Sequence, residues 1–166
     1  MTQYARPDAD TSAGNWAASS GSDRYAMIDE ASADDNDYIS VGSMGSAETI
    51  VLRLSDVDTP DSGTRTVVVR AYEDSGFNSV ALTVTLKEGS TSKGSQGFSS
   101  GFDSVANLSF NITSSISDYS NLNLTISATD PMGMGTAYVY QAYFSVPDAA
   151  AEEEDTTSPA FLLFVD

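Results

Sequence analysis

Apolar and polar residues alternate along most of the chain with a period of two, the spacing of a β-strand. In residues 48–55, for example, Ile50, Leu52 and Leu54 alternate with Arg53 and Ser55. The same pattern recurs in residues 64–72, 80–87, 107–112, 121–127 and 137–146. Because successive side chains of a strand point to opposite faces, each segment is predicted to form a strand with one buried face.

Turn-forming residues separate these segments. Gly, Asp, Ser, Asn and Pro cluster at 58–63, 73–78, 87–90 and 130–135, as tight turns require. Glu88 and Gly89 indicate a hairpin, with 91–100 as its returning strand. Seven to nine short antiparallel strands with one apolar face each are typical of a sandwich or a jelly roll.

The chain reads as one domain with two distinct ends. Residues 1–37 are polar and are predicted to form an extended N-terminal arm packed on the sandwich. Residues 38–147 contain the regular alternation and form the sandwich itself. Residues 148–166 combine an acidic linker with an apolar stretch, which is predicted to be a C-terminal strand.

The aromatic residues suggest how the arm is held. Trp16, the sole tryptophan, lies among small and polar residues, and burying it would remove about 150–250 Å² from water. We therefore expect Trp16 to plug an open end of the sandwich, with Tyr25 and Tyr38 as further structural anchors.

The strand at 137–146 contains several aromatic residues whose orientation bears on function. Its alternation predicts Tyr138, Tyr140 and Phe144 on one face and Tyr143 on the other. Inward aromatic residues usually fill a core. The alternative is a platform on which a sugar stacks, with Trp16, Tyr138, Tyr140 and Tyr143 as its candidates.

The net charge and hydropathy of the chain restrict the kinds of partner that it is expected to bind. There are 24 acidic residues against 7 basic ones, a net charge of −17, which opposes binding to nucleic acid. No apolar run approaches the roughly 20 residues of a membrane-spanning helix. The first residues carry no apolar leader either, so we expect synthesis in the cytoplasm and no nucleic-acid or membrane partner.

The chain lacks the residues that most catalytic mechanisms require. The chain has no histidine and no cysteine, which excludes Ser-His-Asp triads, thiol nucleophiles and the usual zinc sites. We expect no enzymatic activity and no cofactor. Asp56, Asp58 and Asp61 are weak candidates for a structural calcium site, although Pro60 interrupts their spacing and ordinary turn residues are the favoured interpretation.

The C-terminal stretch is apolar enough to require a docking site. Burying each Phe or Leu is worth about 1.5–3 kcal/mol, so the stretch either completes the domain's own sheet or adds a strand to a neighbouring subunit. The candidate interface residues are Tyr4, Phe161, Leu162, Leu163, Phe164 and Val165.

Residues 6–40, RPDADTSAGNWAASSGSDRYAMIDEASADDNDYIS, resemble a module of tailed-bacteriophage virion structural proteins. The matching positions are Arg6, Pro7, Asp8, Asp10, Trp16, Tyr25, Ile28, Asp29, Glu30, Asp34, Asp35, Asp37, Tyr38 and Ile39. Later stretches at 54–72, 115–128 and 140–149 agree as well, so the resemblance extends over roughly 6–149. It implies an all-β fold, an antiparallel β-sandwich of the jelly-roll type, which we expect to have about eight strands.

The resemblance also implies a place in the virion. Together with the missing catalytic residues, it favours a decoration protein on the exterior of the phage head that binds the major capsid protein or other virion proteins. Such a protein is expected to be a homo-oligomer. The alternative is a host-recognition or carbohydrate-binding module on the tail or a spike. Sugar binding predicts exposed Tyr or Trp rings, whereas decoration predicts that those rings are buried.

Overall fold

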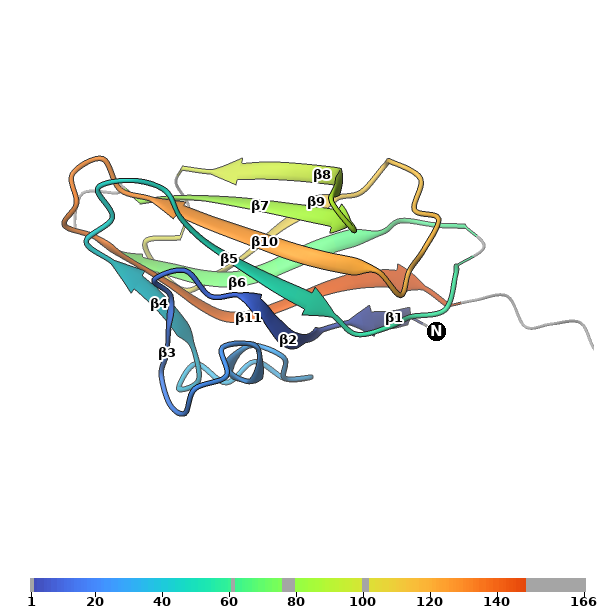
Figure 1. Cartoon of the computed structure of the whole chain (residues 1–166), viewed down its shortest axis with the longest axis horizontal. Coiled ribbons are helices and arrows are strands. Elements are labelled where there is room, and N and C mark those ends of the chain that lie inside the picture. The colour runs from blue at the N-terminus through green and yellow to red at the C-terminus, as the bar shows by residue number, and fades with distance from the viewer. Residues whose placement is uncertain (1, 61, 76–79, 100–101, 149–166) are drawn as a thin grey trace, which may run out of the picture.

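The computed structural model describes residues 2–60, 62–75, 80–99 and 102–148. Two antiparallel sheets pack face to face as a β-sandwich (Figure 1). Sheet A contains β3 (Ala17–Ala18), β4 (Ile39–Gly42), β11 (Thr136–Pro147), β6 (Thr66–Asp74) and β9 (Ala106–Asn111) in that order, with β1 (Thr2–Ala5) also paired to β11. Sheet B contains β2 (Pro7–Ser12), β5 (Glu48–Leu54), β10 (Leu122–Thr129), β7 (Ala81–Glu88) and β8 (Thr91–Phe98).

The connections are those of a jelly roll, as predicted. From β4 to β11 the chain passes from one sheet to the other at every step except the β7–β8 hairpin. That hairpin lies where Glu88 and Gly89 indicated it, and β8 is the predicted returning strand. Among the residues that the structure describes, one 3-10 turn, η1 (Tyr25–Met27), interrupts the β-structure.

The described residues form eleven strands rather than about eight. The three additional strands, β1, β2 and β3, all lie within 1–37, the segment expected to be an extended arm. β1 pairs with β11, and β2 pairs with β5 in the opposite sheet. β3 pairs with β4. None of the three strands carries a regular apolar stripe, but the backbone groups of β1 and β2 cover edges that β11 and β5 would otherwise leave unpaired.

The core follows the alternation of the sequence. Ile50, Leu52 and Leu54 of β5 are buried, whereas Arg53 between them is exposed. β7 repeats the pattern, with alternate side chains of residues 80–86 buried. Apolar residues of both sheets thus interdigitate in one core.

β11 departs from regular alternation at a β-bulge. Its pairing with β6 shifts between Val139 and Gln141, so Tyr140 is an additional residue without a partner on β6. The prediction that Tyr138, Tyr140 and Phe144 share one face is therefore wrong. Tyr138 and Tyr140 lie on the outer face of sheet A with Tyr143, and Phe144 is in the core, because a bulge changes the phase of the pleat.

No helix in the described ranges has both the length and the apolar character needed to span a membrane.

Candidate ligand-binding face

Four tyrosines gather on the outer face of sheet A. Tyr72 lies on β6, Tyr138 and Tyr140 lie on β11, and Tyr38 directly precedes β4. We call these residues the tyrosine cluster. They come together because Tyr138 is directly opposite Tyr72 in the β11–β6 register, and β4 lies along the other edge of β11.

The rings hold one another in fixed orientations. Tyr72 and Tyr138 are stacked, with ring centroids 5.6 Å apart and an angle of 28° between the ring planes. Tyr138 and Tyr140 are nearly parallel at 6.4 Å. Tyr38 meets these two rings edge-on, at 5.3 and 5.8 Å. Such offset and edge-to-face contacts stabilise aromatic groups beyond simple burial, so the cluster is preorganised.

The four tyrosines of the cluster differ in how far they are exposed to solvent. Tyr140 is only 8% exposed, whereas Tyr38, Tyr72 and Tyr138 are half-buried. Desolvation raises the pKa of Tyr138 and of Tyr140, and the negative charges of Asp74 and Asp35, respectively, add to that shift. The hydroxyl groups thus remain protonated at neutral pH and can donate hydrogen bonds.

The segment after η1 borders the cluster and is pinned to β11 and β6. The backbone N–H of Ala142 donates to the carbonyl of Ile28 at 2.9 Å, and Gln141 Nε2 donates to the carbonyl of Glu30 at 2.7 Å. Farther along, the Arg70 guanidinium donates two hydrogen bonds of 2.7 Å to the Asp35 carboxylate. This pairing lowers the pKa of Asp35 and fixes the segment beside Tyr140.

A second aromatic pair occupies the same face near β1. Tyr4 and Tyr143 meet edge-on at 5.4 Å, and the Arg6 guanidinium lies 5.2 and 5.5 Å from the two ring centroids. Tyr4, an interface candidate from the sequence, is 46% exposed. Arg6 also donates to the Glu30 carbonyl at 2.6 Å, so this pair is tied to the same carbonyl that accepts from Gln141.

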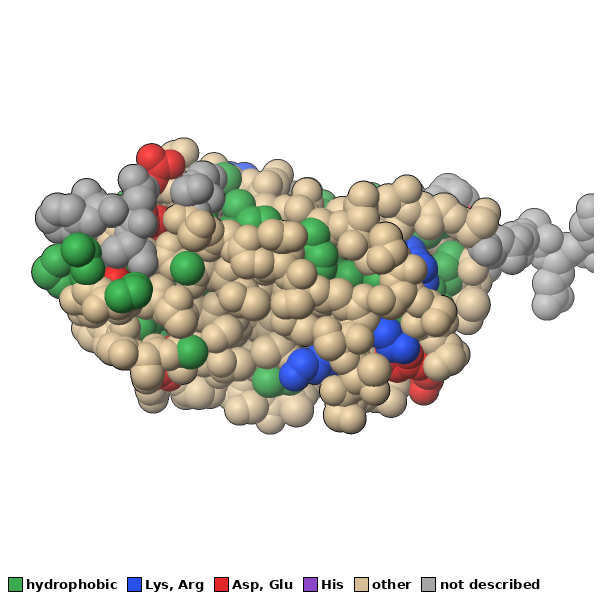
Figure 2. Space-filling view, turned by 90° about the horizontal axis from the view of Figure 1, so that it is seen from above, with side chains coloured by type: hydrophobic (Ala, Val, Ile, Leu, Met, Phe, Trp, Pro, Cys, Tyr) green, Lys and Arg blue, Asp and Glu red, His purple; other side chains and the backbone are tan. Residues whose placement is uncertain are grey.

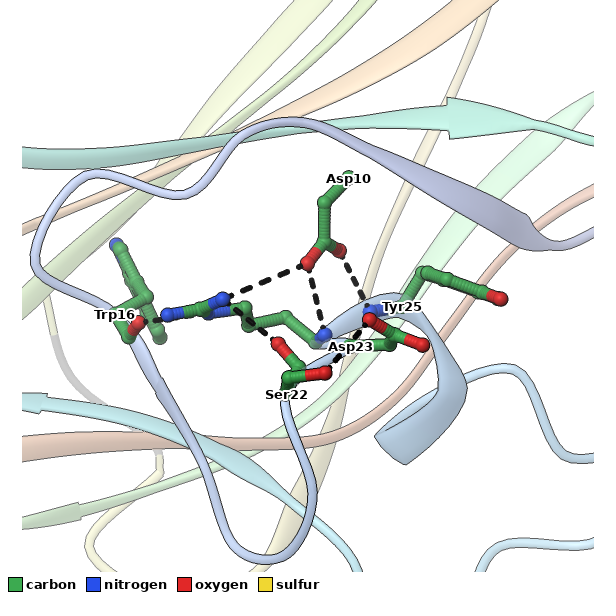
Figure 3. Close-up of polar contacts among 6 residues, drawn as sticks. Asp10, Trp16, Ser22, Asp23 and Tyr25 are labelled. Atoms are coloured by element: carbon green, nitrogen blue, oxygen red, sulfur yellow. Dashed lines mark hydrogen bonds and ion pairs between the residues drawn. The ribbon is translucent and has the colours of Figure 1, made fainter.

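Trp16 is not part of either group. It is 1% exposed, and its Nε1 donates to the carbonyl of Glu48 at 3.2 Å. Around it, Asp10 accepts hydrogen bonds from the backbone N–H groups of Arg24 and Tyr25, and Arg24 Nε donates to the Trp16 carbonyl at 3.1 Å (Figure 3). This network anchors the N-terminal region, so Trp16 is unavailable as a sugar platform.

The calcium candidates do not converge in the described structure. Asp56 and Asp58 are exposed in the loop after β5, and Asp61 lies outside the described residues. The backbone N–H of Asp58 donates to the side-chain oxygen of Gln3. Within the described ranges, no group of three or more acidic side chains is placed to hold a metal ion. The candidate interface residues 161–165 also lie outside the described residues.

Basic side chains do not form a patch on the face of the molecule that Figure 2 shows. The face shown in Figure 2 has isolated Lys and Arg side chains and no extended basic patch. Hydrophobic side chains gather at one end of that view, the end at which the β10–β11 loop lies. Met132 and Met134 in this loop are 59% and 63% exposed.

Sequence reasoning identified only part of the tyrosine cluster. Tyr138 and Tyr140 were candidates for a platform, and Tyr38 was expected to be an anchor. Tyr72 was missed, although the alternation of β6 offered a signal: Val67, Val69 and Ala71 are buried, which turns Tyr72 outward.

Comparison with known proteins found no protein-family model and no curated protein that matches the chain. Among solved structures, it is similar to a family 61 carbohydrate-binding module in complex with β-1,4-galactotriose, with 8% identity, a TM-score of 0.48 and 86% of each chain covered.

Two further structures show a comparable likeness. The family 6 carbohydrate-binding module of the marine laminarinase LamC from Zobellia galactanivorans is 9% identical, with a TM-score of 0.46, covering 89% of this chain and all of that one. A family 36 module in complex with calcium and xylotriose is 18% identical, with a TM-score of 0.38, covering 84% of this chain and 98% of that one. Likeness at this level does not bear on what the chain binds.

Proposed function

We propose that the chain is a non-catalytic carbohydrate-binding module and that the tyrosine cluster is the platform on which a sugar ring stacks. One observation carries the proposal: rings from β6, from β11 and from the residue preceding β4 lie together on an outer sheet face and are only partly covered. Several similar solved structures are themselves carbohydrate-binding modules, and the tyrosine cluster supports the proposal without them.

The cluster has the chemistry that a sugar requires. A pyranose ring has an apolar C–H face, which packs on an aromatic ring, and hydroxyl groups, which need hydrogen-bonding partners. The stacked pair of Tyr72 and Tyr138 supplies the aromatic surface. Ser40 and Asp74 occupy neighbouring outward positions of β4 and β6 and can supply polar groups. Because the rings already fix one another, little side-chain entropy is lost on binding.

A glycan array followed by calorimetry tests this function. We expect the full-length protein to bind at least one neutral oligosaccharide, and Tyr72→Ala and Tyr138→Ala each to weaken binding at least about tenfold, since losing one aromatic contact costs roughly 1.4 kcal/mol or more. Tyr4→Ala is the matched control, because it removes an exposed ring from the same face outside the cluster. Unchanged affinity in the two cluster variants would refute the platform.

The capsid-decoration hypothesis stays a prediction. Its main candidate residues, 161–165, lie outside the described residues, and Tyr4 alone is exposed as it requires. Particle location, homo-oligomerisation and a capsid partner likewise stay predictions. A binding module displayed on a virion would satisfy both hypotheses.

A further inference from the structure

A cavity of about 270 Å³ lies at the end of the sandwich where β11 finishes. Its lining is largely polar and consists of Pro60, Ser62, Gly63, Arg65, Ser115 and Ile116. We call it the Arg65 pocket. It is separate from the tyrosine cluster, and neither the anchoring network of Trp16 nor the proposed sugar platform uses it.

Arg65 is held in place but has no acidic partner among the described residues. Its backbone carbonyl accepts a hydrogen bond from Ile112, and its Nη1 donates to the hydroxyl of the buried Tyr119 at 3.0 Å. The backbone contact holds Arg65 in place, and the hydrogen bond to Tyr119 orients the guanidinium while leaving most of its five N–H donors for a ligand. None of the ion pairs within the described ranges involves Arg65.

Arg65 differs from the other arginines, whose guanidinium groups contact an aspartate or aromatic rings. Arg24, Arg53 and Arg70 each pair with an aspartate, and Arg6 lies over two tyrosine rings. With 24 acidic residues and only 7 basic ones in the chain, a guanidinium in a polar pocket is a favourable site for a carboxylate. Arginine binds carboxylates through two parallel hydrogen bonds, and the Ser62 and Ser115 hydroxyls can donate further ones.

The position of the pocket identifies a source for that carboxylate. β11 ends at Pro147, which packs directly on Gly63 in the pocket wall: a Cβ atom on Gly63 would lie only 2.7 Å from Pro147 Cγ. The acidic run 152–155 (EEED) begins five residues after Pro147, within about 17 Å of extended chain. Such a short connection gives an effective concentration in the millimolar range.

We propose that the Arg65 pocket binds a carboxylate of the chain's own acidic segment, residues 152–155. Binding would hold this acidic segment at the end of the sandwich where β11 finishes. The proposal is independent of sugar binding at the tyrosine cluster.

Amide shifts of the ¹⁵N-labelled full-length protein test the site, with sodium acetate as a carboxylate probe. A variant with Glu152→Gln, Glu153→Gln, Glu154→Gln and Asp155→Asn removes the proposed occupant. We expect its Ser62, Gly63 and Ser115 signals to move from their original positions. Acetate should then saturate these shifts with an apparent affinity at least about threefold higher than in the unmodified chain, where the acidic segment competes.

Three controls make the outcome decisive. Arg65→Gln should abolish both effects, and circular dichroism checks that it folds. Arg53→Gln removes an exposed guanidinium elsewhere and should leave both effects intact. Asp61→Asn tests the acidic residue nearest in sequence to the pocket and should not reproduce the shifts of the neutralised segment.

Each contrary result overturns a definite part of the proposal. Equal acetate affinity in the two forms would show that the pocket takes an external carboxylate and not residues 152–155. Shifts that appear only with Asp61→Asn would assign Arg65 to that residue. Absence of acetate saturation in the neutralised variant would remove the carboxylate site altogether.

Discussion

Trp16 is among the largest fully buried side chains, and it lies in a segment otherwise composed of small and polar residues. The neighbouring residues from Ala13 to Ser20 bury little apolar surface of their own. The indole fills the core, its Nε1 donates to the Glu48 carbonyl, and its own carbonyl accepts from Arg24. A single residue therefore couples this segment to β5 and to η1.

Replacing this residue tests the coupling. Trp16→Ala should lower the free energy of unfolding by about 3–5 kcal/mol because it leaves a large cavity. Trp16→Phe should cost less, since it retains most of the ring while leaving the Glu48 carbonyl without its donor. Urea denaturation followed by far-UV circular dichroism measures both. Equal stability of the alanine variant and the unmodified protein would show that the N-terminal segment is held in some other way.

At the scale of elements, alternation was sufficient to predict the strands that face the core. β5, β7 and β10 have apolar side chains at every second position, and the predicted segments overlap them. β1, β2 and β3 were not predicted, because edge strands are stabilised by backbone pairing that leaves no period-two stripe. The tyrosine cluster was only partly predictable, since its assembly depends on the long-range pairing of Tyr138 with Tyr72 and on a bulge.

The bulge itself leads to a prediction about β11. On the β6 side, Ala71 pairs with Val139 and the next residue, Arg70, pairs with Gln141, so Tyr140 interrupts an otherwise continuous register. Deleting Tyr140 should therefore yield a folded protein in which Val139, Ala142 and Phe144 remain inward. Its thermal midpoint should fall moderately, because the ring contacts with Tyr38 and Tyr138 are lost.

A deletion of Tyr143 is the matched comparison for that experiment. It also removes one tyrosine from β11, but it lies in a regular part of the pairing and would invert the faces of the residues on one side of it. We expect this variant to be insoluble or unfolded by circular dichroism. If both deletions behave alike, the bulge does not determine which residues β11 can lose.

The Glu88 carboxylate, at the end of β7, is expected to make the stability of the fold depend on pH. The Glu88 carboxylate accepts hydrogen bonds from Lys93 and Ser117, which together lower its pKa from 4.5 to about 2. A carboxylate whose pKa is lower in the folded state contributes stability above its unfolded pKa and loses that contribution as pH falls toward its folded pKa. The contribution of Glu88 should therefore be complete above about pH 5 and disappear between about 4.5 and 2.

Thermal unfolding measured across this pH range tests whether the contribution of Glu88 to stability falls as the pH falls. Glu88→Gln should melt below the unmodified protein at pH 7, and the gap between their midpoints should close as pH approaches about 2. In a double-mutant cycle, Lys93→Met should reduce the effect of Glu88→Gln. A gap that stays constant from pH 7 to pH 2 would show that the ionised carboxylate is not what stabilises the hairpin.

For the whole molecule, the dominant physical property is its charge. The chain has 24 acidic residues and only 7 basic ones. Four of the basic side chains pair with acidic ones in the described structure, namely Arg24, Arg53, Arg70 and Lys93. Most of the acidic residues therefore have no basic residue to balance their charge. Repulsion among these acids opposes the compact state. Ions screen exposed charges over about 10 Å at 0.1 M salt and about 3 Å at 1 M, so salt relieves that repulsion more than it weakens close pairs such as Arg70 with Asp35.

We therefore expect the thermal midpoint at pH 7 to rise as sodium chloride increases from about 0.05 to 0.5 M, because the distance over which exposed charges interact falls about threefold over this range. Scanning calorimetry at matched protein concentration measures it, and sucrose at equal osmolality controls for general stabilisation by excluded solutes. The same series run on the variant neutralised at residues 152–155 should show a smaller rise, because four acids fewer contribute to the repulsion. A midpoint that falls with salt would mean that the ion pairs of Arg24, Arg53, Arg70 and Lys93 stabilise the fold more than the repulsion among the acidic residues destabilises it.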